Sequence, residues 1–175
     1  LKLRAPEGMV QNVFAAAGAA PVNLPGSEVF TSLDKGVIDA ADYNTFSTNA
    51  AQGLHDVAKH PVYPGFHSMP LIEVSMNKAK WDALPEDLQT ALEDSVKEFA
   101  TYQSETVHER DMEAVEEAKA GGEITVHDWS DEDRAKFRAI ARSQWEEAAG
   151  ASANSQKVYD TLTTYLVEEG LMADE

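Results

Sequence analysis

Short apolar segments separated by glycine and proline follow one another through the first 77 residues. The helical spacing of the apolar positions in 9–17 predicts one buried face, and Gly18 is suited to end that helix. Ser27 is placed to cap a second helix, which Gly36 would end. Alternating strands and helices with short links favour a parallel sheet. The expected elements are strand 1–4, helix 9–17, extended segment 20–23, helix 28–35, and strand and turn 37–43.

The pattern changes near Asn77. Before it we expect one more helix, a proline-rich extended segment, and the strongest strand signal in the sequence. After it, long helices dominate. The expected elements are helix 48–58, extended segment 60–65, strand 70–77, a helix from 81 to 120, strand 124–126, a helix from a capping run at Ser130 to Ala148, and helix 155–169.

The helix expected to start at Trp81 is the longest element. Pro85 is tolerated in its first turn, and Gly121-Gly122 would end it. Roughly 35 residues give a length of about 50 Å, which exceeds the width of a compact domain of this size. We therefore expect the helix to cross a domain boundary or to kink. Its apolar residues share one face: Leu84, Leu88, Leu92, Val96 and Phe99.

Charge and composition exclude several classes of protein. The 175 residues include 14 basic and 31 acidic side chains, a formal net charge of −17. Such a chain lacks the cationic face that nucleic acid requires. Its longest apolar run is far below the ~20 residues of a membrane-spanning helix, so we expect no membrane insertion. The absence of cysteine excludes disulfides, thiolate zinc sites and cysteine nucleophiles.

Arg4 is the residue that most favours a ligand site. It ends the first strand and precedes a turn and a helix. In open α/β sheets, ligands bind beyond the carboxyl ends of the strands. A guanidinium there can hold a carboxylate through two hydrogen bonds, with the N–H groups of a helix start nearby. The alternative is an arginine in a surface ion pair.

Two further segments are candidates for the same site. In Asp42-Tyr43-Asn44, past a strand end, Asp42 could ligate a cation or orient a hydroxyl, while its two neighbours supply donors. An ordinary turn is the alternative. The loop 64–70 could line a pocket or simply pack into the core. The residues of interest in this loop are Phe66, His67 and Ser68.

Motifs of catalysis are missing from the sequence. It has no glycine-rich phosphate loop, no Gly-x-Ser-x-Gly and no His-Glu-x-x-His. We interpret the acid-rich second part as the solvated faces of amphipathic helices. The histidines fall at no metal-ligand spacing, so we expect no organised metal–histidine site; they are His55, His60, His67, His108 and His127.

Several blocks in a fixed order resemble one family. They are Leu1–Pro6, Gly18–Val22, Ser27–Ala41, Ala58–Gly65, Met76–Lys78 and Trp81–Gln89. Together they resemble the solute-binding subunits of tripartite ATP-independent periplasmic (TRAP) transporters, of the DctP type. The resemblance covers nearly the whole chain but only the C-terminal half of that family.

The resemblance implies a periplasmic, non-enzymatic receptor. Such a protein binds a small organic acid anion, here a 2-oxo, 2-hydroxy or related carboxylate, between two lobes and delivers it to membrane permease subunits. The family's carboxylate-binding arginine corresponds to Arg4, and an acidic–aromatic pair of one branch corresponds to Asp42-Tyr43. That branch places a cation-binding glutamate after Pro-Gly, where this chain has Phe66-His67-Ser68. A bound Na⁺ or Ca²⁺ therefore stays open, as does a homodimer, and His67 or Ser68 could bind the solute instead.

The expected fold is α/β, a periplasmic-binding-protein-like clamshell of type II, present here as a fragment. Residues 1–77 would form an α/β lobe with a small parallel or mixed sheet and one wall of the cleft. Residues 78–122 would be the long inter-lobe helix, and 123–175 a short strand and the C-terminal helices. The chain opens inside a strand-like tetrad, so we expect the N-terminal lobe to be absent and the apolar surface it would cover to be exposed.

Three other functions remain open. An α/β enzyme acting on a small carboxylic acid would use His67 as base and Arg4 as anchor. A sensor lobe would bind a similar ligand and signal instead of transporting. A helical interaction module would bind no small ligand.

Overall fold

The computed structural model describes residues 1–66 and 73–172, and the chain divides into two compact units. The first unit contains residues 1–43 and 129–175, and the second contains residues 44–128. The lobe expected over residues 1–77 is thus shared between the units, because the segment after residue 43 packs on the long helix of the second unit. None of the helices described is long and apolar enough to cross a membrane.

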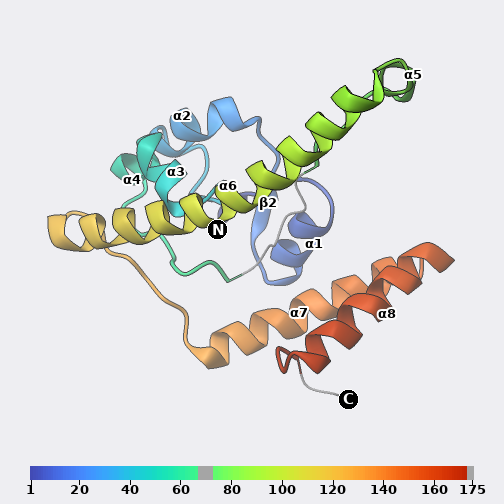
Figure 1. Cartoon of the computed structure of the whole chain (residues 1–175). Helices are drawn as coiled ribbons and strands as arrows, with labels where there is room; N and C mark the ends of the chain where they lie inside the picture. Colours follow the sequence, from blue (N-terminus) through green and yellow to red (C-terminus); the bar gives the residue numbers. More distant parts are fainter. Residues whose placement is uncertain (67–72, 173–175) are drawn as a thin grey trace. The chain divides into compact units, whose positions relative to one another are not determined.

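A three-stranded parallel sheet forms the centre of the first unit (Figure 1). Its strands are β1 (Lys2–Arg4), β2 (Ala20–Val22) and β3 (Ala40–Ala41), in the order β2-β1-β3. Leu3 of β1 pairs with Pro21 on one side and Ala40 on the other. Pro21 is accommodated because β2 is an edge strand, where a missing N–H costs no internal ladder bond. The parallel sheet predicted from the alternation of elements is confirmed.

The helices that connect these strands begin and end largely as expected. Helix α1 (Met9–Ala16) buries Val13 and Phe14, and Gly18 follows it with a φ of +91°. A 3-10 turn η1 (Gly26–Glu28) precedes α2 (Val29–Asp34). The cap expected from Ser27 is wrong, because this residue lies inside η1 and no side chain caps α2.

Two long helices complete the first unit. Helix α7 (Asp131–Ala149) and helix α8 (Ala153–Glu168) lie side by side (Figure 1). The cap expected at Ser130 is confirmed, since its Oγ accepts the backbone N–H of Asp133 at 3.1 Å. Phe137 of α7 packs on Phe14 of α1, with ring centroids 5.6 Å apart. The buried apolar residues of this unit are Leu3, Ala5, Val13, Phe14, Val29, Ile38, Phe137, Ala141 and Ala149.

The second unit is helical. Its elements are α3 (Phe46–Ala51), α4 (Leu54–Val57), α5 (Lys78–Asp82) and α6 (Glu86–Gly121). The single helix expected over 48–58 is wrong, because Gly53 adopts a φ of +73° and separates α3 from α4. The expected start at Trp81 is also wrong: this residue lies in α5, and α6 begins after Pro85. A proline disfavours helical backbone at the residue before it, so the two helices cannot be continuous.

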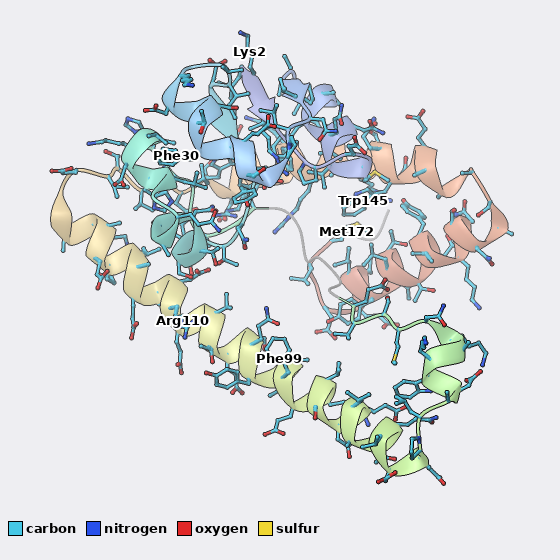
Figure 2. The ribbon with its side chains drawn as sticks, turned by 90° about the horizontal axis from the view of Figure 1, so that it is seen from above. Lys2, Phe30, Phe99, Arg110, Trp145 and Met172 are labelled. Carbon is cyan, nitrogen blue, oxygen red and sulfur yellow. The ribbon has the colours of Figure 1, made fainter. Side chains whose placement is uncertain are left out.

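Helix α6 has 36 residues and is followed by Gly122, whose φ of +71° ends it. Its C-terminal part packs against α3, where the backbone N–H and the hydroxyl of Ser47 both donate to the carboxylate of Asp111, at 2.8 and 2.5 Å. In its first half, which carries Phe99 (Figure 2), the predicted apolar face is exposed. The exposed fractions are Leu88 49%, Leu92 45%, Val96 39% and Phe99 54%.

Two strand predictions are wrong. Residues 73–77 are exposed and belong to no strand of the part of the chain that is described, and residues 70–72 of the same prediction lie outside it. The strand expected at 124–126 is reduced to a single parallel bridge between Val62 and His127. An apolar run becomes a strand only where a neighbouring strand supplies hydrogen-bond partners.

His55 is a buried titratable group in the second unit. Its ring packs against Phe46, with centroids 4.5 Å apart, and it is 6% exposed. Its Nδ1 has no hydrogen-bond partner among the residues described. Burial lowers the pKa of His55 below its ordinary value of 6.5, and the nearby charge of Asp56 acts in the opposite direction with a smaller effect.

This burial predicts acid sensitivity. Well above pH 6.5 the histidine is neutral in both the folded and the unfolded chain, and its contribution to the free energy of unfolding is complete. As the pH falls below 6.5, the unfolded chain takes up the proton more readily than the folded chain, so stability is lost. Urea unfolding at pH 7, 6 and 5 should show a flatter pH dependence for His55→Gln than for wild type. His108→Gln, at an exposed position on α6, should keep the wild-type slope, and equal slopes for all three proteins would contradict the assignment.

Candidate functional site

The carboxyl edge of the parallel sheet brings three chain segments together. Arg4 is the last residue of β1, Leu24 follows β2, and Asp42 follows β3. Because the strands are parallel, the loops that follow them leave from the same edge. Arg4, the first candidate identified from the sequence, therefore lies at this edge.

The side chain of Arg4 links the backbones of the two flanking loops. Its Nε–H donates to the carbonyl of Leu24 at 3.3 Å, and Nη1 donates to the carbonyl of Asp42 at 2.7 Å. Its guanidinium carbon lies 5.2 Å from the ring centroid of Tyr43, a cation–π distance. The guanidinium is therefore fixed in orientation by two neutral acceptors and an aromatic face.

Arg4 is half-buried and forms no ion pair with any carboxylate that the structure describes. The surface ion pair that the sequence left open is thus not formed within residues 1–66 and 73–172. Its hydrogen bonds to carbonyls leave the positive charge uncompensated, with Nη2 lacking an acceptor among these residues. An arginine in this state can offer two parallel N–H donors to an anion.

Tyr43 is positioned from two sides. Its ring face lies against Arg4, and its hydroxyl edge lies against the backbone of Gly26. A Cβ added at Gly26 would be 2.7 Å from the tyrosine Oη and 3.0 Å from a ring carbon, closer than nonbonded atoms approach. Only glycine lets the ring lie there. Sequence reasoning missed this role, and the Pro25-Gly26 pair signals only a turn.

Asp42 is tied to Arg4 through the main chain. Its N–H donates to the carbonyl of Arg4 at 2.8 Å, and its own carbonyl accepts from the guanidinium. This reciprocal pairing continues the β1–β3 ladder by one residue and holds the half-buried Asp42 side chain at the sheet edge.

The remaining candidates belong to the second unit. Asn44 is exposed: its Oδ1 accepts the N–H of Thr45 at 2.8 Å, and its carbonyl accepts from the Asn49 amide at 2.9 Å. This is the turn that starts α3. Phe66 is half-buried. His67 and Ser68 lie outside the residues described. The structure therefore brings together Arg4, Asp42 and Tyr43 from the predicted set.

A metal centre built from three or more histidine, aspartate or glutamate side chains does not occur among the residues described. Asp42 supplies one carboxylate to the edge of the sheet. Outside the sheet edge, the structure forms a contact between His60 and His127 that their spacing in the sequence did not suggest.

Comparison with known proteins decides the family. Residues 1–151 match the family described as bacterial extracellular solute-binding protein, family 7, or DctP. The chain belongs to this family. Its members are receptors of TRAP transporters and not enzymes, so the family predicted from the sequence blocks is confirmed. Proteins of the DctP family are periplasmic.

Two relatives of this DctP-family chain are named as carboxylate-binding proteins. It is 31% identical over 134 residues to the C4-dicarboxylate-binding periplasmic protein DctP of Rhodobacter capsulatus, covering 77% of this chain and 40% of that one. It is 29% identical over 161 residues to the monocarboxylate 2-oxoacid-binding periplasmic protein all3028 of Nostoc, covering 91% and 44%. The chain thus spans less than half the length of these two relatives.

Solved structures confirm the fold. A TRAP periplasmic solute-binding protein from Rhodobacter sphaeroides, in an apo open structure, is 67% identical with a TM-score of 0.80, over 99% of this chain and 55% of that one. A TRAP binding protein from Pseudoalteromonas atlantica, solved with bound sodium and pyruvate, has a TM-score of 0.78 over 98% and 52% at 21% identity. The expected clamshell fold, represented here by part of it, is therefore shown.

The contact between Gly26 and Tyr43 can be tested by substitution. Gly26→Ala should destabilise the chain by about 1–3 kcal/mol, because the added Cβ overlaps the tyrosine ring. Gly121→Ala, at the end of α6 with open space around its Cβ, should be neutral or stabilise by up to about 1 kcal/mol. Urea unfolding measures both.

A double-mutant cycle separates the tyrosine contact from any other effect at this position. In a Tyr43→Ala background, Gly26→Ala should cost almost nothing, because the overlapping ring is gone. An unchanged cost in that background would show that Gly26 is required for another reason.

Proposed function

We propose that this chain supplies the carboxylate-binding wall of a TRAP-type solute receptor and that Arg4 binds the acid. The observation that carries the proposal is the state of Arg4. Its guanidinium is oriented by two backbone carbonyls and Tyr43, while its charge is not neutralised by any described carboxylate. A small organic acid anion supplies the missing negative charge.

The proposed solute is a small mono- or dicarboxylic acid, and we expect 2-oxo and 2-hydroxy acids to bind most tightly. The names of the two curated relatives support carboxylates of both kinds. In this proposal, Arg4 pairs with the carboxylate and Tyr43 donates its hydroxyl to the 2-substituent. The half-buried Asp42 orients a 2-hydroxyl. The assignment of Phe66, His67 and Ser68 to the same site stays a prediction from the sequence. Asn44, engaged at the start of α3, contributes to the turn.

A cation beside the solute is a separate question. The Pseudoalteromonas protein holds sodium with pyruvate. At the sheet edge described here, Asp42 is one carboxylate and no group of three metal-binding side chains is found among the described residues. The described side chains at this edge thus supply one of the six to eight oxygen ligands that a Ca²⁺ ion takes. We therefore base the proposed solute binding on Arg4, Asp42 and Tyr43, and route no step through a cation.

The exposed apolar face in the first half of α6 fits the same proposal. Leu88, Leu92, Val96 and Phe99 present large apolar side chains that a soluble protein normally covers. The relatives are about twice as long as this chain. We propose that the part of the receptor outside this chain packs on this face, and that the complete receptor delivers its acid to the membrane permease.

The decisive test is substitution of Arg4 in the complete receptor. Arg4→Ala should weaken binding of the acid by about 100-fold or more, since two charge-assisted hydrogen bonds are lost. Arg4→Lys should also bind weakly, because an ammonium cannot hold both carbonyls and a carboxylate in one plane. Calorimetry with a panel of 2-oxo, 2-hydroxy and dicarboxylic acids measures the affinities.

Arg138→Ala is the matched control, because Arg138 is an exposed arginine on α7. It should leave the affinity unchanged. Wild-type affinity in a folded Arg4→Ala protein would refute the assignment. Loss of binding in Arg138→Ala as well would point to a general effect of charge instead of a contact.

A further inference from the structure

An exposed histidine pair lies in the second unit, formed by two residues that have no role in the proposed solute binding. Nδ1 of His60 is 3.1 Å from Nε2 of His127, although 67 positions separate the two residues in the sequence. The ring centroids are 5.3 Å apart, with the ring planes inclined by 38°. The spacing of the histidines along the chain gave no indication of this contact.

Main-chain hydrogen bonds hold both histidines in place. The N–H of His127 donates to the carbonyl of Pro61 at 2.8 Å, and its carbonyl accepts the N–H of Tyr63 at 2.7 Å. The N–H of Thr125 donates to the carbonyl of Lys59 at 2.9 Å. Pro61 also restricts the backbone of His60 to extended conformations. The two rings are thus brought together by the backbone and do not depend on each other for their position.

Charged residues lie next to both histidines in the chain, and the lysine beside His60 forms an ion pair. The Lys59 ammonium, next to His60 in the chain, lies 3.5 Å from the carboxylate of Glu123. Asp128 follows His127 and carries the opposite charge. The lysine next to His60 in the chain is therefore already paired with a glutamate.

The separation of the two nitrogens suits metal binding. A zinc or copper ion binds imidazole nitrogen at about 2.0–2.1 Å. Two such ligands on one ion, at angles between square-planar and tetrahedral, are about 2.9–3.4 Å apart. The observed 3.1 Å falls inside this range. In the metal-free chain a hydrogen bond between the two nitrogens spans the same gap, and a metal ion would displace its proton.

We propose that His60 Nδ1 and His127 Nε2 form a surface site for a divalent transition-metal ion, with water completing the coordination. Neutral imidazole favours Cu²⁺, Ni²⁺ and Zn²⁺ over Na⁺, Mg²⁺ and Ca²⁺, which prefer oxygen. No third histidine, aspartate or glutamate joins the pair among the residues described, so the site is open and its ion exchangeable. This proposal is independent of solute binding.

Metal binding at this pair would stabilise the second unit. The ion would link the segment before α5 to the segment after α6, reinforcing the single β-bridge between Val62 and His127. A ligand that binds only the folded chain raises the melting temperature in proportion to the logarithm of its concentration. The ion would thus act as a clamp across the two ends of the helical segment.

The experiment titrates the complete protein and its His60→Gln and His127→Gln variants with CuSO₄ in a calorimeter. Wild type should bind one tight ion per chain, and each variant should lose about tenfold or more in affinity because one of two ligands is gone. NiCl₂ and ZnCl₂ should raise the melting temperature of wild type and not of the variants. CaCl₂ should not raise it in any of them.

His108→Gln is the matched control, since His108 is exposed on α6 and should keep wild-type binding. Copper electron paramagnetic resonance of wild type tests the site without any variant, and coupling to two nitrogens is expected. Coupling to one nitrogen or none would overturn the proposal. Wild-type copper affinity in His60→Gln or His127→Gln would also overturn it. So would a stoichiometry of one ion per two chains together with a dimer in light scattering, because the ion would then join two molecules.

Discussion

The site depends on the parallel orientation of three short strands. Parallel strands send the loops that follow them from the same edge, so the carbonyls of Leu24 and Asp42 both come within reach of Arg4. If β1 were antiparallel to its two neighbours, both loops would leave from the edge opposite to Arg4. The hydrogen bonds serve two needs at once. They satisfy partly buried backbone carbonyls, which are costly to leave unpaired, and they fix the guanidinium before any ligand arrives.

The elements that the sequence predicted correctly are those whose signals are local. Gly18 and Gly122 end helices through left-handed backbone, and Ser130 caps α7 with its own side chain. Each of these features needs only a few neighbouring residues. The predictions that failed concern segments whose structure depends on distant partners or on a second, competing local signal. Residues 73–77 have the pattern of a strand but are exposed, and Gly53 interrupts a segment whose apolar spacing is helical.

The sequence identifies candidate side chains for the site but not the backbone groups that position them. Arg4 and Tyr43 stand out in the sequence because one ends a strand and the other follows one, and both side chains can bind a ligand. The partners of Arg4 are backbone carbonyls, which every residue has and which therefore leave no trace in the sequence. Gly26 matters because it has no side chain, and its role appears only once Tyr43 lies beside it. The pair of His60 and His127 exists because two distant segments pair through their backbones, which no spacing rule can show.

The proposed binding of an anion is physically compatible with the acidic composition of the chain. The net charge of −17 is spread over the whole molecule, and 24 of the 31 acidic residues follow residue 77. At physiological ionic strength, exposed charges more than about 8 Å away are largely screened. A half-buried guanidinium in direct contact with a carboxylate is screened much less, so the contact outweighs the distant charges. Under the proposed function, the negative charge of the whole molecule would slow the approach of an anion, while the few donors at the sheet edge would determine its affinity.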